Sequence, residues 1–217
     1  WSDFCDICIN MTSNESTYGV ITADVVNSTA LSVQELEILL DRVKYEFDEA
    51  KNLTIQAQWV QRGDAFQILT DEPSRSLEVA MFLRSVVNLS IRSANQSISA
   101  LPKTDLRMAI GLGTVTLHRS EISESTGPAF VRAGRALDKM KATSDRRFKI
   151  ITGHEDIDKE LDLTSHMMSA IFQRWSYASA EVLYWYLKGH QTQHEIATQL
   201  GITQSSVQRR WIDGSAP

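Results

Sequence analysis

Two aspartates in strand-like surroundings are the residues of this sequence best suited to chemistry. Asp24 lies in an apolar stretch over 18–26 that predicts a buried strand. Asp64 follows Gly63 between two strand-forming segments, where glycine supplies the positive φ of a tight hairpin. A buried carboxylate is costly unless it is paired, and a divalent cation suits two facing carboxylates. We therefore predict a shared metal at Asp24 and Asp64; the alternative is a turn-capping Asp64 and a backbone-bonded Asp24.

The segments around these aspartates predict an α+β fold with the element order β-α-β-β-α-β-α-β. This is a ferredoxin-like palm, with a βαββαβ core and one added helix and strand. In that topology the first strand and the central hairpin are neighbours, which favours a meeting of Asp24 and Asp64. The predicted strands and hairpin cover 18–26, 53–70, 106–117 and 147–152, with helices beginning near Val33, Pro73 and Pro128.

The C-terminal part predicts a small all-α helix-turn-helix domain. Thr192 and Glu195 form a capping box, and the pattern over 195–207 resembles the helix-turn-helix of sigma factors and response regulators. Its second helix leaves four polar side chains outside that can reach base edges or phosphates: Gln204, Ser205, Gln208 and Arg209. We predict binding to double-stranded DNA, with protein contacts as the alternative. The predicted domains are an extension (1–16), the palm (17–153) and a linker helix with the helix-turn-helix (154–217).

Composition narrows the classes of protein. The net charge of −5 over 217 residues argues against a chain that coats nucleic acid nonspecifically, although 164–217 carries four basic against three acidic residues. The two cysteines, Cys5 and Cys8, form neither a disulfide framework nor a zinc site of the usual ligand number, and we assign no role to the first ten residues. No apolar run is long enough to cross a bilayer, so we expect a cytoplasmic protein without a membrane partner.

The palm segment resembles the catalytic domain of class III nucleotide cyclases. The stretch 22–29 is similar to their first metal-binding strand and turn, Gly63-Asp64 to their second metal-binding hairpin, and Arg135 falls where they place a phosphate-contacting arginine. The resemblance implies Mg²⁺ or Mn²⁺ at Asp24 and Asp64, a nucleoside triphosphate ligand and a homodimer. In an active enzyme Arg135 would be the catalytic residue. The nucleotide contacts that it implies are Val25, Asn27, Ser28, Thr29, Gly63, Arg132 and Arg135.

Two positions depart from the cyclase pattern. Val131 stands where the family has a ribose-contacting asparagine, and Val60 stands where adenylate-forming members have a base-reading lysine. Over most of its length the chain resembles the bacterial SatD family, which joins such a palm to a C-terminal helix-turn-helix. We predict a DNA-binding regulator whose palm binds a magnesium nucleoside triphosphate. The alternatives are an active nucleotide cyclase or related nucleotidyltransferase, and a degenerate palm that serves only dimerisation.

Overall fold

The computed structural model describes residues 16–54, 57–94, 104–116, 125–143, 146–189 and 191–215. Cys5, Cys8 and nearly all of the predicted extension lie outside these residues. The chain groups into two compact units, and the predicted division at residue 153 remains a prediction. The first unit comprises the described residues of Trp1–Asp24, Gln56–Leu77 and Arg107–His166. The second comprises those of Val25–Ile55, Glu78–Leu106 and Met167–Pro217.

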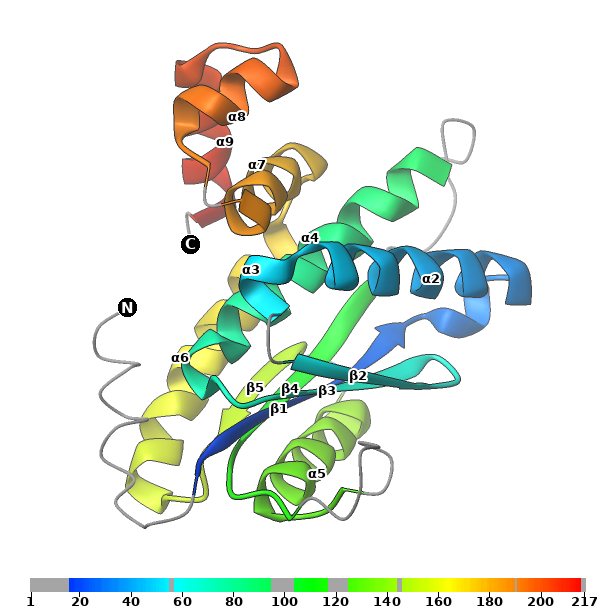
Figure 1. Ribbon diagram of the computed structural model, residues 1–217, viewed down its shortest axis with the longest axis vertical. Helices are drawn as coiled ribbons and strands as arrows, with labels where there is room; N and C mark the ends of the chain where they lie inside the picture. Colours follow the sequence, from blue (N-terminus) through cyan, green and yellow to red (C-terminus); the bar gives the residue numbers. More distant parts are fainter. Residues whose placement is uncertain are drawn as a thin grey trace. The chain divides into compact units, whose positions relative to one another are not determined.

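The fold is mixed α+β, and its sheet has five strands in the order β2-β3-β1-β4-β5 (Figure 1). The central pair β1 and β3 and the hairpin β2–β3 are antiparallel, whereas β4 and β5 are parallel. The strands are β1 (Tyr18–Val26), β2 (Ala57–Arg62), β3 (Ala65–Thr70), β4 (Asp105–Gly113) and β5 (Phe148–Ile151). The order of strands and main helices through β5 is the predicted one.

Eight α-helices and two 3-10 turns complete the described part of the chain. The α-helices are α2 (Val33–Glu49), α3 (Lys51–Thr54), α4 (Ser76–Ala94), α5 (Pro128–Thr143), α6 (Glu155–Arg174), α7 (Tyr177–Gly189), α8 (Gln193–Leu200) and α9 (Gln204–Ser215). The 3-10 turns are η1 (Ser28–Ala30) and η2 (Pro73–Arg75). The capping box predicted for α8 is present, because the Thr192 hydroxyl accepts from the Glu195 amide and the Glu195 carboxylate accepts from the Thr192 amide.

Two predicted elements differ from the observed ones. The hairpin does not begin near Leu53: this residue lies in α3 with its side chain buried, and β2 begins at Ala57. The strand predicted over 106–117 is β4, which ends at Gly113. The linker helix predicted after residue 153 is present as α6, which runs from Glu155 to Arg174. The first part of α6 is fixed to the edge of the sheet, because the Ser165 hydroxyl accepts a hydrogen bond from the Ile150 amide at 3.1 Å.

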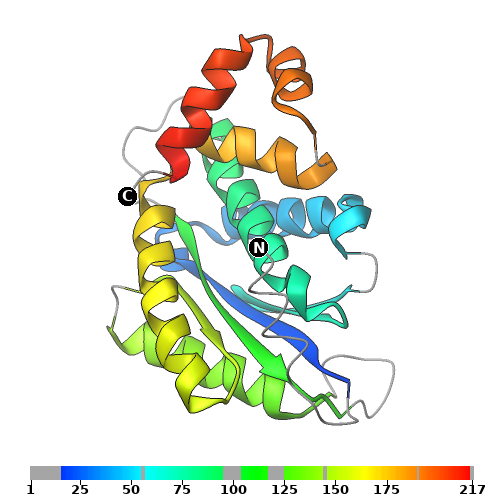
Figure 2. The same ribbon diagram turned by 90° about the vertical axis from the view of Figure 1, so that its left-hand side faces the viewer.

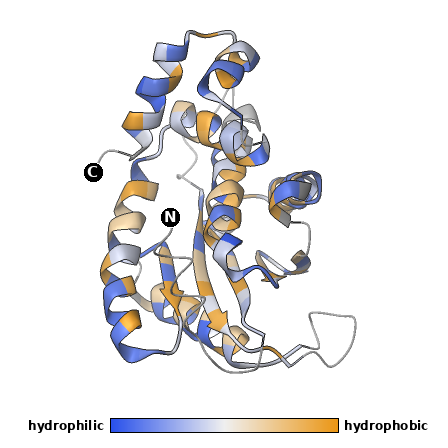
Figure 3. Ribbon diagram, turned by 60° about the vertical axis from the view of Figure 1, so that its left-hand side comes forward, coloured by the Kyte–Doolittle hydropathy of each residue, from blue (hydrophilic) through white to orange (hydrophobic). Residues whose placement is uncertain are grey.

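Small residues let α5 approach the sheet closely. A Cβ atom on Gly111 of β4 would lie 2.2 Å from the carbonyl oxygen of Ala129, so only glycine fits there. A glycine inside a strand commonly marks such a close approach of another backbone segment. Ala129 and Ala133 of α5 pack with Val20 and Leu69 of the sheet. The ribbon turned by 90° shows α5 along the sheet (Figure 2), and apolar residues dominate the strands (Figure 3).

None of the helices in the described residues combines the length and the apolar character needed to cross a bilayer.

Candidate functional site

The register of β1 and β3 brings the two predicted aspartates to one end of the sheet. Asp24 pairs with Ala65, the residue directly after Asp64. Asp64 and Gly63 form the two-residue loop between β2 and β3, and Gly63 has a φ of 63°, as the sequence predicts for this turn. Because Asp64 lies in the loop, strand alternation does not fix the direction of its side chain. The shared metal site stays a prediction.

Asp24 is buried, and two cationic side chains pair with its carboxylate. Nη1 of Arg107, from β4, lies 3.3 Å from Oδ1 and 3.1 Å from Oδ2. Nζ of Lys141, near the end of α5, lies 3.0 Å from Oδ2. The side chain of Asp24 is 6% exposed and that of Arg107 13%, whereas that of Lys141 is 45% exposed. The desolvation cost of the Asp24 carboxylate is therefore offset by protein cations.

The Asp24 cluster, which we define as Asp24, Arg107 and Lys141, has hydrogen-bonding capacity left over. Nε of Arg107 is buried and has no hydrogen-bond partner among the described residues. A buried N–H without an acceptor costs free energy, so its presence at such a cluster requires an explanation.

The donor set at this end of the sheet suits a magnesium ion that also binds phosphate. Magnesium is usually held by one or two carboxylates together with substrate phosphates and water, rather than by a protein cage. Asp24 at the end of β1 and Asp64 in the β2–β3 loop match that pattern in ligand type. No group of three or more histidine, cysteine, aspartate or glutamate residues suited to a metal occurs in the part of the chain that the structure describes.

The predicted nucleotide contacts directly after Asp24, Val25 and residues 27–29, lie at the end of β1 and in the turn that follows it. Val25 is buried in the strand, so its side chain is not available to a ligand. Asn27 adopts a left-handed conformation with a φ of 61°, and Ser28 and Thr29 begin η1. Asparagine tolerates this conformation better than most residues, which explains a turn without glycine at this position.

The two arginines predicted to contact the nucleotide, Arg132 and Arg135, lie in different surroundings. Nη1 of Arg132 donates to the carbonyl oxygen of Leu112 at 2.5 Å, and its guanidinium fills the space left by Gly113 and Gly153. Arg132 therefore has a structural contact at the far end of β4. Arg135 is exposed on α5, six residues before Lys141, which is about 9 Å along the helix axis.

The four residues predicted to contact DNA are all exposed on α9. Gly201, with a φ of 64°, ends α8 in the left-handed conformation and turns the chain toward α9. Val207 faces the opposite way and is fully buried against Val182, Ile196 and Ala197. The exposed residues are Gln204, Ser205, Gln208 and Arg209.

A second buried carboxylate, Glu46 of α2, was not singled out from the sequence. Its Oε2 accepts from the Tyr184 hydroxyl and from Nζ of Lys188, both at 2.7 Å, and Lys188 also donates to Tyr184 at 2.8 Å. Its Oε1 pairs with Arg42 at 2.5 Å. Burial, the largest influence, raises the pKa of Tyr184, and it would lower the pKa of Lys188. The hydrogen bonds of Lys188 to Glu46 and Tyr184 outweigh its burial, so its pKa is raised.

Arg107 and Lys141 were also missed. The signal for Arg107 is a charged residue inside an otherwise apolar strand, which requires a partner. Lys141 carries no comparable signal, because a lysine near the end of an amphipathic helix is ordinary.

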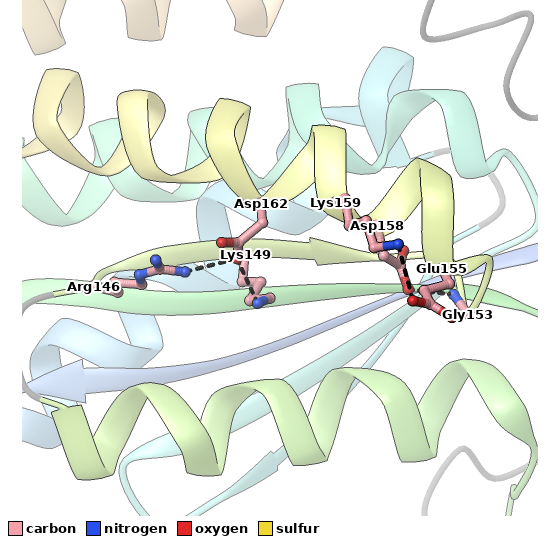
Figure 4. A pocket seen from close by; sticks show the side chains of 7 residues that line it. All are labelled: Arg146, Lys149, Gly153, Glu155, Asp158, Lys159 and Asp162. Carbon is pink, nitrogen blue, oxygen red and sulfur yellow. Dashed lines mark hydrogen bonds and ion pairs between the residues drawn. The ribbon is translucent and has the colours of Figure 1, made fainter.

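A polar hollow between β5 and α6 shows a contrasting arrangement (Figure 4). Asp162 accepts from Lys149 at 2.6 Å and from Arg146 at 2.7 Å, and these hydrogen bonds lower the pKa of its carboxyl group. Asp158 accepts from the amides of Thr152 and Gly153. The polar groups of this hollow pair with one another.

Comparison with known proteins gives matches among solved structures. No family model matches the sequence, and no curated protein matches it. The catalytic core of a rhodopsin-guanylyl cyclase with converted specificity, in complex with ATPalphaS, is 19% identical, with 57% of this chain and 72% of that chain covered and a TM-score of 0.38. A bacterial light-regulated adenylyl cyclase is 13% identical, with coverages of 64% and 77% and a TM-score of 0.43. The monomeric guanylyl cyclase domain of the RhoGC fusion protein from the aquatic fungus Blastocladiella emersonii is 18% identical, with coverages of 57% and 75% and a TM-score of 0.33.

Proposed function

We propose that this protein has a cyclase-like palm, which binds the phosphates of a nucleoside triphosphate at the Asp24 end of the sheet. The observation that carries the proposal is the β1–β3 register, which sets Asp24 beside the Gly63-Asp64 turn. The cations Arg107 and Lys141 converge on the same end, and Nε of Arg107 lacks an acceptor there among the described residues. Carboxylates for a metal and cations for phosphate oxygens are the groups that a metal–triphosphate complex requires.

In this proposal Asp24 and Asp64 hold Mg²⁺ or Mn²⁺, which supplies Lewis-acid neutralisation of phosphate charge when bound. The chain's own residues do the rest. The Gly63 turn provides backbone groups beside the phosphates, and exposed Arg135 of a second protomer provides a further cation. The turn over 27–29 stays a predicted nucleotide contact. A homodimer follows from the cyclase resemblance, because class III cyclases complete each site across a two-fold interface. Arg132 is the weakest of the proposed contacts because its guanidinium already binds the Leu112 carbonyl.

The test is a thermal-shift titration with each nucleoside triphosphate, with and without Mg²⁺ or Mn²⁺, followed by chromatography of the products. A ligand that binds only the folded state raises the melting temperature by mass action. We expect a rise that Asp64→Asn abolishes, because half of the carboxylate pair is lost. Asp71→Asn, outside the pair, is the matched control and should leave the rise intact. No rise with any triphosphate would contradict the proposal.

The enzyme alternative predicts turnover in the same experiment. A cyclic or linear product that requires Asp64 would favour a nucleotide cyclase or nucleotidyltransferase, with Arg135 stabilising the charge of the transition state. A rise in melting temperature without product would favour a sensor. A rise that is absent while the protein is dimeric would favour a palm that serves only dimerisation.

We further propose that the α8–α9 pair is a helix-turn-helix that binds double-stranded DNA, as in the SatD-like regulator that the sequence suggests. The supporting observation is the division of α9 into a packed side with Val207 and an exposed side with Gln204, Gln208 and Arg209. Such a side suits base edges and phosphates. A fluorescence titration with the promoter DNA of its own operon, at stated salt concentrations, tests it. Absence of salt-dependent binding would leave α8–α9 as a protein-contact module.

A further inference from the structure

We propose that Arg107 and Lys141 exclude a bare metal ion from Asp24 and admit one only together with a polyphosphate. This proposal rests on the proposed nucleotide site and specifies the order in which its ligands bind. The phosphate tail binds through these two cations, and the metal follows it.

The charges of the Asp24 cluster carry the first step. One buried carboxylate faces two cations at 3.0–3.3 Å, so the three side chains of the cluster sum to a net positive charge; this sum leaves out Asp64 of the β2–β3 loop. A divalent cation alone would meet that positive charge and would also have to displace the guanidinium or the ammonium from Asp24. The charges of Asp24 and Arg107 are largely buried, so salt screens them poorly, whereas the charge of Lys141, which is 45% exposed, is screened more.

Hydrogen-bonding capacity carries the second step. Arg107 has five N–H donors in a fixed fork, and its buried Nε has no acceptor among the described residues. Lys141 has three donors on a flexible, partly exposed stem, so it can turn from Asp24 without unfolding α5. A polyphosphate carries several anionic oxygens and matches both groups. Once its oxygens take these donors, Asp24 regains free lone pairs for a metal.

The ligand class is therefore a polyphosphate chain, as found in a nucleoside triphosphate and in inorganic tripolyphosphate. A monocarboxylate or a single halide could occupy one donor but could not reverse the sign of the cluster. Comparison of tripolyphosphate with ATP separates recognition of the phosphate chain from recognition of the nucleoside.

The experiment uses the full chain and Lys141→Gln, with Lys139→Gln as the matched control on the exposed part of the same helix. One arm titrates Mn²⁺ alone and measures bound ion by electron paramagnetic resonance. The other arm titrates tripolyphosphate, and then ATP, in metal-free buffer by calorimetry. Loss of one charge-assisted hydrogen bond should weaken tripolyphosphate binding by about tenfold. Removal of the same positive charge should strengthen bare Mn²⁺ binding by about tenfold.

Opposite changes in the two arms, absent from Lys139→Gln, are the expected result. Changes in the same direction, or none, would overturn the inference, since a merely structural Lys141 would weaken both ligands together. Wild-type protein that binds tripolyphosphate but no ATP would support the inference while contradicting the proposed nucleotide function. Wild-type protein that binds ATP but no tripolyphosphate would overturn the inference and leave the nucleotide function standing.

Discussion

Asp24 and Glu46 are both buried carboxylates with cationic partners, yet their surroundings differ in one respect. At Glu46 the Tyr184 hydroxyl and Lys188 both donate to Oε2, and Lys188 also donates to Tyr184, which closes a ring of hydrogen bonds. Among the described residues, Arg107 and Lys141 contact no acceptor besides the Asp24 carboxylate, and the N–H at Nε of Arg107 has no hydrogen-bond partner.

This difference separates a stabilising network from a candidate binding site. A buried polar network whose members are all satisfied rigidifies the fold and leaves nothing for a ligand. A cluster with spare donors carries a cost in the ligand-free protein, and that cost is recovered when an acceptor arrives. We therefore expect Glu46 to stabilise the fold and the Asp24 cluster to bind the proposed ligand. Four predictions test this division, beginning with the largest effect.

Glu46→Ala should destabilise the protein by about 3 kcal/mol or more, because Lys188 and Tyr184 lose their acceptor while Tyr184 stays buried. Denaturant unfolding monitored by circular dichroism measures it. Glu49→Ala, an exposed glutamate of the same helix, is the control and should change the free energy of unfolding by less than about 0.5 kcal/mol. Equal changes in the free energy of unfolding for the two substitutions would contradict a stabilising role for Glu46.

The sequence predicted what depends on neighbouring residues. The capping box at Thr192 and Glu195 and the turn at Gly63 rest on spacings of a few residues, and both are observed. The sequence order of the strands followed from apolar stretches, from alternating apolar patterns and from the Gly63 turn. The partners of Asp24 and Glu46 did not follow, because Arg107 is 83 residues from Asp24 and Lys188 is 142 residues from Glu46. Such pairs are fixed by the three-dimensional path of the chain.

The short helix at Leu53 and the position of Arg132 also depend on contacts that are distant in sequence. The stretch at Leu53 has no helix signal of its own, but burial of that side chain holds a short helix where the sequence predicted the start of a strand. Tertiary packing overrides weak local preference. Arg132 was predicted to contact the nucleotide, but its guanidinium lies in the space left by the glycines at 113 and 153, which are far apart in sequence.

Gly111→Ala tests the support of the Asp24 cluster. The new methyl group would collide with the Ala129 carbonyl and push α5, which carries Lys141, away from β4. Overpacking of this kind costs about 1–3 kcal/mol. We expect a lower denaturation midpoint together with weaker triphosphate binding. Gly134→Ala, on α5 with open space around it, is the control and should leave the midpoint unchanged or raise it. A neutral Gly111→Ala would show that the cluster does not depend on this contact.

Alkaline pH should loosen the Glu46 network. The pKa values of Tyr184 and Lys188 are raised in the folded state, so both keep their protons where the unfolded chain loses them, above about pH 10. The unfolded state then binds fewer protons, and stability falls as pH rises through this range, whereas the contribution is fully present at lower pH. Denaturant midpoints across the alkaline range measure the fall. Tyr184→Phe should be less stable at neutral pH but should show a shallower fall; an unchanged slope would exclude Tyr184 as a cause.

The substitution expected to change stability least lies on the exposed side of α9. There, too, a side chain that is already paired can be compared with one that is exposed. Arg210 donates to Glu181 at 2.8 Å and is occupied, whereas neighbouring Arg209 is exposed on the side proposed to meet DNA. Arg209→Ala should leave the free energy of unfolding within about 0.5 kcal/mol of wild type, because little packing is lost. If Arg209 contacts a phosphate, binding should weaken for all sequences and the slope of log affinity against log salt should fall by about one. Arg174→Ala, an exposed arginine near the end of α6, is the matched control and should change neither quantity. A fluorescence titration at three salt concentrations distinguishes a phosphate contact from a base contact. Equal slopes for wild type and Arg209→Ala would exclude the phosphate contact. A loss of affinity that depends on the identity of one base pair would instead assign Arg209 to a base edge.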